Sequence, residues 1–207
     1  HNTSHLMQYH DLIESIVAAM DARDAYTAKH SDRVADMVLV LATALDLSED
    51  ETTLLHMAAH LHDIGKIAVP DSVLRKAGPL TNPEWEEMRR HPVTGYEILR
   101  KIDDFKEIAV LVRHHHERWD GRGYPDGLRG ADIPLGSRIL AVADSIDAMM
   151  SSRSYRPAMT SAACRREIER NSGIMYDPRV AAAALAHWDE LVSRYAEADT
   201  PQTPYFD

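Results

Sequence analysis

The sequence predicts an all-α protein: a single compact helical bundle with one long, structured loop rich in glycine and proline. Two observations lead to this class. Apolar residues recur at intervals of three and four along most of the 207-residue chain, which is the spacing that gathers them on one face of a helix. No stretch shows the alternation of apolar and polar residues that is typical of a half-buried strand, and no internal repeat is visible.

The first part of the chain is predicted to contain three helices. Helical spacing predicts one helix over residues 8–25 and a second with His30 in its first turns. Ser48 and Glu51 have the spacing of a capping box, in which each side chain bonds the other residue's backbone N–H, so a third helix is expected to start there. We expect Gly65 to end this helix.

Local start signals predict the remaining helices, about nine in all. Thr81 and Glu84 have the spacing of another capping box, and we interpret Asp104 and Glu107 in the same way. Further helix starts are expected at Pro92, Ser137, Thr160 and Asp177-Pro178. Residues 119–136 contain five glycines and two prolines, which predicts a long structured loop.

The chain is divided into three parts. Residues 1–7 look like an expression remnant or a linker and are excluded from the fold. Residues 8–195 are predicted to form the folded domain. Residues 196–207 are polar, contain two prolines and are expected to be a mobile tail.

Composition limits the possible partners and location. The net charge of −10 and the lack of a basic stripe argue against nucleic-acid binding, so an anionic substrate would need a local positive site, which metal ions could supply. The single cysteine, Cys164, suits a reducing cytoplasm. No apolar run approaches membrane-spanning length, so we expect a cytoplasmic protein without a membrane segment.

Seven imidazole and carboxyl side chains are candidate metal ligands: His30, His62, Asp63, His91, His115, His116 and Asp144. They come from five separate elements, as a site at the centre of a helical bundle requires. The set is too large for one tetrahedral ion but sufficient for two octahedral ions that share Asp63, whose two oxygens can bridge them. Mixed imidazole and carboxylate ligands with open positions suit Fe(II) or Mn(II) better than zinc.

A rival ligand set lies on one helix face, with His56, His60 and Asp63 at spacings of four and three. His62 is about 200° around the helix from His60, so both cannot point into one site. The rival set is disfavoured because histidines on a helix face usually have a structural or solvent role. His114 is expected beside the site or at the surface, and two histidines outside any cluster are expected to be solvated: His10 and His187.

Two runs of residues resemble a known family. They are His62-Asp63-Ile64-Gly65-Lys66 and His115-His116-Glu117-Arg118-Trp119-Asp120-Gly121-Arg122-Gly123-Tyr124-Pro125, and together they resemble the HD-GYP domain, a branch of the HD phosphohydrolases. The resemblance covers about Asp11 to Leu191. It implies a helical bundle with two or three metal ions, usually iron or manganese. It also implies hydrolysis of cyclic di-GMP to linear pGpG, and in some members on to GMP, by a water that the metals activate.

The resemblance also implies roles for single residues. One metal would be held by His30, His62, Asp63 and Asp144, and the second by Asp63, His91, His115 and His116. Asp63 and Lys66 would be catalytic, and the substrate would meet Lys66, Tyr124, Arg153 and Arg156. Family members with a third metal have a glutamate where this chain has Tyr26, so two metals are expected.

Simpler roles stay open for some of these side chains: Lys66 as a cap of a helix end, Arg153 and Arg156 as partners of surface carboxylates, and Tyr124 as loop packing. The alternative functions are a catalytically weak cyclic di-GMP sensor or diguanylate-cyclase-interaction module, and a hydrolase of another nucleotide. An upstream sensor or receiver domain, a diguanylate cyclase domain and a second copy of the chain are the possible protein partners.

Overall fold

The computed structural model describes residues 4–23, 29–152 and 157–198. Within these ranges the chain is helical and contains no strand, only an isolated bridge between Ser172 and Tyr176. The predicted all-α class is therefore confirmed. Among the same residues, no helix is both long and apolar enough to cross a membrane.

The helices follow one another along the chain with short connections, apart from one long loop. In order they are η1 (Ser4–Tyr9), α1 (His10–Asp21), α2 (His30–Ala44), α3 (Glu49–Leu61), η3 (Ile64–Ala68), α4 (Asp71–Leu74), α5 (Asn82–Met88), α6 (His91–Leu99), η4 (Asp103–Phe105), α7 (Lys106–Arg113), η5 (Gly130–Asp132), α8 (Leu135–Met150), α9 (Ser161–Arg170), α10 (Pro178–Ala186) and α11 (Trp188–Ala198), where η denotes a 3-10 helix.

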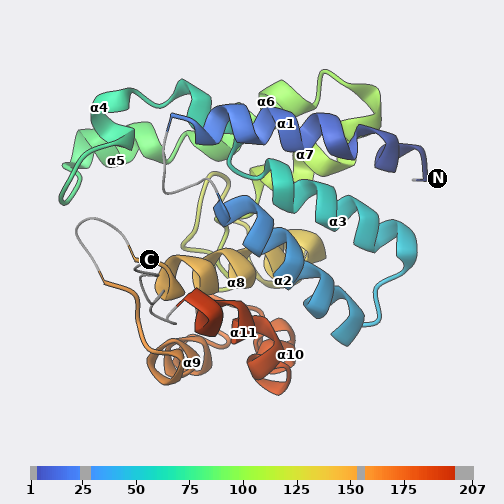
Figure 1. Cartoon of the computed structure of the whole chain (residues 1–207), viewed down its shortest axis with the longest axis vertical. Coiled ribbons are helices and arrows are strands. Elements are labelled where there is room, and N and C mark those ends of the chain that lie inside the picture. Colours follow the sequence, from blue (N-terminus) through green and yellow to red (C-terminus); the bar gives the residue numbers. More distant parts are fainter. Residues whose placement is uncertain (1–3, 24–28, 153–156, 199–207) are drawn as a thin grey trace, which may run out of the picture.

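Helices α2, α3 and α8 form the centre of the bundle. Helix α2 packs against both α3 and α8, while α3 also contacts α1 and α7. Figure 1 shows α1 on one side of this centre and α9, α10 and α11 on the other, with α4 and α5 projecting from one end. This packing brings five segments together at the centre of the bundle: α2, the end of α3, α6, the end of α7 and α8.

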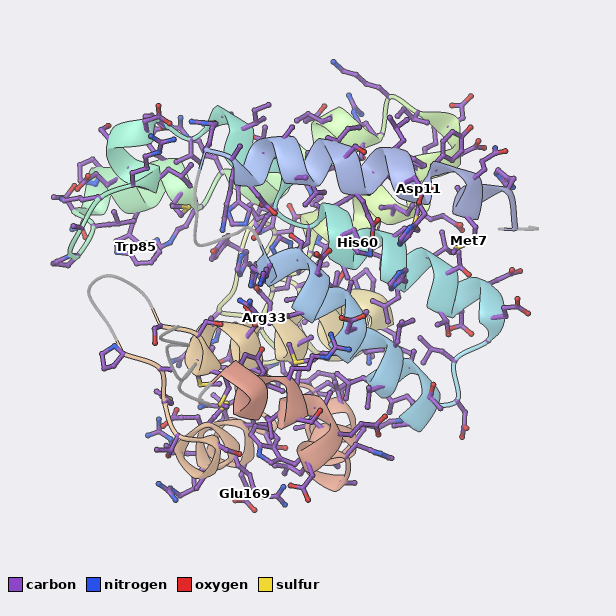
Figure 2. The ribbon with its side chains drawn as sticks, viewed as in Figure 1. Met7, Asp11, Arg33, His60, Trp85 and Glu169 are labelled. Atoms are coloured by element: carbon purple, nitrogen blue, oxygen red, sulfur yellow. The ribbon has the colours of Figure 1, made fainter. Side chains whose placement is uncertain are left out.

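The core is a continuous apolar cluster that joins these helices. Many of its large, fully buried side chains come from α2, α3, α7, α8 and the C-terminal helices, among them Leu41, Leu55, Met57, Ile108, Leu140, Ile146, Ile168 and Leu191. Figure 2 shows side chains filling the space between the ribbons. Burial of each such side chain contributes about 1.5–3 kcal/mol of transfer free energy, so the core provides a rigid frame for polar groups placed within it.

Several predicted helix starts are confirmed. Ser48 with Glu51, and Thr81 with Glu84, form complete capping boxes at the starts of α3 and α5. The Thr160 side chain caps α9. The Asp177 carboxylate accepts a hydrogen bond from the backbone of α10.

Other boundaries differ from the prediction. Asp104 lies inside the 3-10 helix η4, and no side chain caps the start of α7. Helix α8 begins before Ser137, whose hydroxyl is buried and donates to the Leu111 carbonyl at 2.8 Å. The last predicted helix is interrupted at His187 and continues as α11. Leu6, in the part set aside as a remnant, is buried in the core, while the domain boundaries themselves stay predictions.

Gly65 does not simply end α3, which already stops at Leu61. It lies within η3, and a Cβ atom added there would be 1.9 Å from the His91 carbonyl oxygen and 2.7 Å from the Gly95 nitrogen. Only glycine permits this close approach, because no side-chain carbon fits between η3 and α6. The contact brings His91 beside the end of α3.

Candidate metal centre

Three histidines use the same device to aim one ring nitrogen. Nδ1 of His62, His91 and His115 lies 2.6, 2.7 and 2.5 Å, respectively, from the carbonyl oxygen three residues earlier in the chain. A carbonyl can only accept, so Nδ1 must carry the hydrogen and Nε2 of a neutral ring bears the lone pair. All three rings are buried, and their Nε2 atoms face the centre of the bundle.

His30 is oriented by a carboxylate instead. It is the first residue of α2, and its Nδ1 lies 2.5 Å from Oδ2 of Asp147, which is fully buried on α8. The same carboxylate accepts hydrogen bonds from Arg33 at 2.5 Å and from the Tyr195 hydroxyl. These contacts leave Nε2 of His30 facing Oδ1 of Asp144 at 2.9 Å.

The aimed nitrogens meet in two groups. Nε2 of His30 and Nε2 of His62 are 3.2 Å apart, and one ligand atom each of these residues and Asp144 lie within 4.8 Å of one another. Nε2 of His91 and Nε2 of His115 are 3.4 Å apart, and these residues form a second group of the same size with His116.

Asp63 lies between the two groups. Its Oδ2 is 3.4 Å from His30 Nε2 and 3.3 Å from His62 Nε2, while its Oδ1 is 3.4 Å from His91 Nε2. One oxygen therefore faces each group, as a carboxylate that bridges two ions requires. The structure thus brings together all seven candidate ligands.

The donor chemistry of the centre fits divalent metal ions. Facing imidazole lone pairs repel each other at these distances unless a cation lies between them, and buried carboxylates need a compensating charge. Five imidazoles and two carboxylates provide borderline and hard donors for two ions. Four of the five histidines are held through their other nitrogen, as metal-binding histidines usually are: His30, His62, His91 and His115.

Electrostatics differ between the two groups. Burial alone would raise the pKa of Asp63 and of Asp144, but the neighbouring imidazoles hold both well below the usual value. Burial would lower the pKa of His30, but hydrogen bonds to Asp144 and Asp147 raise it to about 10. In the second group burial dominates and lowers the pKa of His91 to about 3 and of His115 to about 4. A cation at the first group must therefore displace a proton, whereas the second group is already neutral.

Lys66 is one turn beyond Asp63 in η3. Its Nζ lies 3.2 Å from Oδ2 of Asp63 and the side chain is half-buried. The ammonium group thus contacts the carboxylate that lies between the two groups, which the capping interpretation did not anticipate.

A large cleft opens onto the centre. Its volume is about 1280 Å³, and it is lined by candidate ligands on the floor and by basic and aromatic side chains around them, among them Arg23, Lys66, Arg75, Lys76, Trp85, Arg118 and Tyr124. Pockets for small molecules are typically about 300–1,000 Å³, so this cleft can hold a larger ligand. Several of these basic side chains are paired with carboxylates: Arg23 with Asp71, Lys76 with Glu84 and Arg118 with Asp120.

The predicted glycine-rich loop is a structured wall of this cleft. Glu117 is buried, and its two carboxylate oxygens accept from the backbone N–H groups of Asp126 and Leu128 at 3.1 and 3.2 Å. Tyr124 donates its backbone N–H to His116, and the two rings stack with centroids 5.1 Å apart. The loop therefore fixes the orientation of the His116 ring.

Three residues of the prediction cannot be placed. Arg153 and Arg156, expected to meet the substrate, and Tyr26, expected to leave no third metal site, lie outside the described residues.

Sequence reasoning did not assign a role to Asp147. Its position three residues after Asp144 places both carboxylates on one face of α8, which is a usable signal. Its partners Arg33 and Tyr195 are far away in the chain, so their convergence depends on packing of α2 and α11 against α8.

The expectation that His10 is solvated outside any cluster is wrong. Its ring stacks on His56 with centroids 5.6 Å apart and lies edge-on to His60 at 5.1 Å. The disfavoured rival set does not form, because His56 and His60 join His10 of α1 while Asp63 faces the centre. Burial lowers the pKa of His56 and lowers that of His60 to about 4.

Comparison with known proteins agrees with this fold. Residues 11–180 match the family model described as HD domain. The cyclic di-GMP phosphodiesterase response regulator RpfG of Xanthomonas campestris is 41% identical over 193 residues, covering 91% of this chain and 51% of the relative. The 3′3′-cGAMP-specific phosphodiesterase 2 of Vibrio cholerae is 40% identical, covering 88% of this chain and 35% of the relative. The chain therefore spans about half, or less, of the length of these relatives.

Solved structures share the fold. A cyclic GMP-AMP-specific phosphodiesterase of V. cholerae, V-cGAP3, superposes with a TM-score of 0.67 at 20% identity, over 92% of this chain and 50% of the other. An HD-GYP-type protein of Bdellovibrio bacteriovorus superposes with the same TM-score at 19% identity, over 91% and 65%. From the family match, the relatives and the shared fold, the chain belongs to the HD domain family, and its resemblance to the HD-GYP branch is confirmed.

Proposed function

We propose that this domain is a metal-dependent phosphodiesterase that hydrolyses cyclic di-GMP to linear pGpG. The observation that carries the proposal is the position of Asp63, whose two oxygens each face a separate group of convergent imidazole nitrogens. Such a pair of donor groups around one carboxylate suits two divalent ions, and two-ion sites are a common solution for phosphodiester hydrolysis.

The metal ligands in this proposal are the seven candidates named from the sequence. His30, His62 and Asp144 hold one ion, His91, His115 and His116 hold the other, and Asp63 contributes to both. Imidazole and carboxylate donors with open positions favour iron or manganese. When bound, such ions supply a Lewis acid that polarises the phosphodiester and activates water.

Other side chains of the protein position a metal ligand, stabilise the transition state and contact the substrate. Asp147, through Nδ1 of His30, keeps Nε2 aimed at the centre, which fixes one ligand before substrate arrives. Lys66, held 3.2 Å from Asp63, stabilises the extra negative charge of the transition state or protonates the leaving 3′ oxygen. Tyr124, stacked on His116, forms the wall against which the substrate lies.

Cyclic di-GMP is the proposed substrate for two reasons. Relatives from X. campestris and Thermotoga maritima named as cyclic di-GMP phosphodiesterases are 41% and 38% identical to this chain. The cleft is larger than common small-molecule pockets and carries basic side chains around its acidic floor, which suits a ligand with two phosphates. We place Arg153 and Arg156 at the second phosphate on the family resemblance alone.

The test is hydrolysis by the anaerobically metal-loaded chain, with metal content measured on the same sample. Asp63→Asn keeps the size of the side chain but removes its charge, so both ions and product formation should be lost. Asp189→Asn on α11, an exposed carboxylate, is the matched control and should retain both. Metal-loaded protein that binds cyclic di-GMP tightly without forming pGpG would refute the enzyme and favour the sensor alternative.

A second candidate substrate is 3′,3′-cyclic GMP-AMP. A relative specific for this dinucleotide by name is 40% identical to the chain, which lies between the 41% and 38% of the two cyclic di-GMP enzymes. The ratio of kcat/KM for the two dinucleotides, measured on one preparation, decides between them.

We further propose that the folded unit, residues 8–195 together with the buried Leu6, acts in the cytoplasm under control of a receiver or sensor domain. Support for such control comes from the name of the X. campestris relative, a response regulator of which this chain matches 51%. Phosphodiesterase activity of the domain alone and of a fusion to a receiver domain, with and without phosphorylation, tests the regulatory part.

A further inference from the structure

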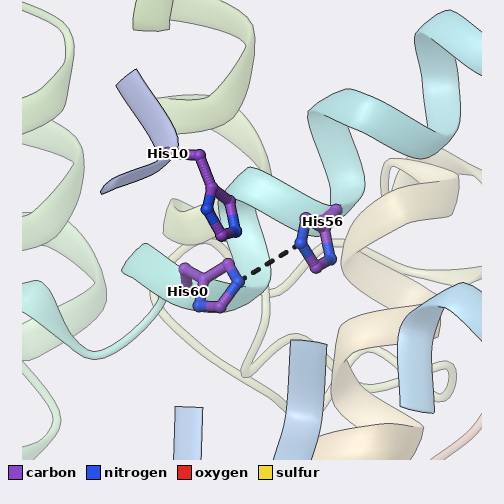
Figure 3. Close-up of side chains that lie close together, drawn as sticks. All are labelled: His10, His56 and His60. Carbon is purple, nitrogen blue, oxygen red and sulfur yellow. Dashed lines mark hydrogen bonds between the residues drawn. The ribbon is translucent and has the colours of Figure 1, made fainter. Parts of the chain in front are cut away.

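We propose a second metal site, separate from the central one, in which His10, His56 and His60 bind a zinc-like divalent ion that clips α1 onto α3. This inference goes beyond the proposed function and does not depend on it. One ring nitrogen from each histidine lies within 4.8 Å of the others, and Figure 3 shows the three rings facing one another across the two helices.

The spacing of the imidazole nitrogens fits a tetrahedral ion. Nε2 of His56 and Nε2 of His60 are 3.3 Å apart, at the dashed line in Figure 3. Zinc binds imidazole nitrogen at about 2.0–2.1 Å, and a tetrahedral angle then separates two ligand nitrogens by roughly 3.3 Å. His10 brings a third ring from α1, with its centroid 5.1 Å from that of His60.

The hydrogen bonds of this cluster do not satisfy all of its ring nitrogens. Nδ1 of His56 faces the Ala35 carbonyl at 3.4 Å, so it carries the hydrogen and Nε2 presents a lone pair to His60. His60 is buried, and its Nδ1 has no hydrogen-bond partner.

Neither neutral tautomer of His60 satisfies its surroundings. With hydrogen on Nδ1, its Nε2 lone pair faces the lone pair of His56. With hydrogen on Nε2, a bare Nδ1 faces the Asp32 carboxylate at 3.6 Å. A cation between the two Nε2 atoms removes both conflicts, because Nδ1–H then points to Asp32, as metal-binding histidines commonly point to a carboxylate.

We assign Glu14 as the fourth ligand of this site. Its carboxylate is 3.6 Å from Nε2 of His10, and it forms a further close group with Asp32 and His60. Three imidazoles and one carboxylate are a typical tetrahedral zinc set, whereas iron and manganese prefer more oxygen donors and higher coordination. The two sites of the chain therefore differ in the ion they favour.

The ligands come from two helices, which indicates what the ion does. His10 and Glu14 lie on α1, and His56 and His60 lie on α3, whose end carries His62 and Asp63. An ion here fixes α1 against the helix that positions the central site. Removal of the ion should loosen α1 first.

The test compares zinc and cobalt binding by the full chain and by His10→Gln. Wild-type protein, stripped and titrated with zinc against a chromophoric chelator, should bind one ion more per chain than His10→Gln. With cobalt, the wild type should show the intense visible bands of a tetrahedral ion and His10→Gln should not. His187→Gln, which changes an exposed histidine between α10 and α11, is the matched control and should behave like the wild type.

Glu14→Gln is a second variant at an exposed position and guards against misfolding of the first. It should weaken zinc binding at this site at least tenfold while leaving the far-UV spectrum unchanged. Equal stoichiometry and equal cobalt spectra for the wild type, His10→Gln and Glu14→Gln would overturn the proposal. That result would mean that the cluster is satisfied by a proton or by packing alone.

Discussion

Replacing Asp147 by asparagine tests how the central site is oriented. The carboxylate is fully buried and accepts hydrogen bonds from His30 Nδ1 at 2.5 Å, from Arg33 at 2.5 Å and from the Tyr195 hydroxyl. An asparagine keeps the shape but offers one accepting oxygen in place of two and carries no charge. His30 or Arg33 must therefore lose an acceptor.

The expected loss can be estimated from this contact. A hydrogen bond to a charged group contributes about 1.5–3 kcal/mol, which corresponds to roughly a 10–100-fold change in an equilibrium constant. Removal of a carboxylate behind a metal-binding histidine typically costs about 10–100-fold in metal affinity or activity. We therefore expect Asp147→Asn to weaken metal binding at the His30 group 10–100-fold, with kcat reduced in parallel.

The assay is competition for metal against a chelator of known affinity, followed by hydrolysis at saturating metal. Tyr195→Phe removes one donor to the same carboxylate but leaves the contact between Asp147 and His30 Nδ1 in place, so metal affinity should fall clearly less than in Asp147→Asn. If Asp147→Asn binds metal as tightly as Tyr195→Phe, then Asp147 does not orient His30 and the reasoning is refuted.

Four further predictions concern the stability and chemistry of the domain. The pKa of His30 is raised to about 10 in the folded protein, against 6.5 in the unfolded chain, so protonation of His30 stabilises the metal-free protein. This stabilisation is complete below pH 6.5 and is lost as the pH rises through 10, so the urea midpoint should fall over that range. A urea midpoint that does not change with pH, or the same slope in His30→Gln, would contradict this prediction. Gly65→Ala, whose Cβ would meet a backbone oxygen at 1.9 Å, should destabilise by about 1–3 kcal/mol in urea unfolding. Gly95→Ala, which meets a side chain at 3.0 Å, should cost clearly less, and the reverse order would contradict the packing account. Trp85→Ala should raise KM about 5–150-fold with little change in kcat, because a half-exposed indole at the cleft can stack on a base, and Trp85→Phe should restore much of the loss. Lys66→Met should lower kcat about 10²–10³-fold with metal content retained, and loss of metal instead would assign Lys66 a purely structural role.

Local signals in the sequence predicted local structure well. Ser48 with Glu51 and Thr81 with Glu84 cap their helices because the capping box depends only on residues three apart. Asp104 with Glu107 has the same spacing, but the chain forms a 3-10 turn up to Phe105, whose buried ring outweighs the weak local preference.

The candidate ligands could be found because their residue types are costly to bury without a cation. The contacts that orient these ligands could not be predicted from residue type. The contact of Asp147 with Arg33 and Tyr195 depends on helices that are distant in the sequence, and the role of Gly65 depends on α6 packing against η3.

The His10 cluster was missed for the same reason. Spacing along α3 identifies His56 and His60 as neighbours, and nothing in the spacing of α1 indicates that His10 will lie against them. The third partner of a cluster that joins two helices becomes visible only when their packing is known.

The most direct test of the central claim is anomalous diffraction from crystals of the chain loaded anaerobically with iron or manganese. We predict two peaks about 3.5–4 Å apart, as in other two-metal sites, one beside His30, His62 and Asp144 and one beside His91, His115 and His116, with Asp63 between them. A single peak, or no peak within reach of Asp63 in protein whose metal content has been verified, would contradict the account.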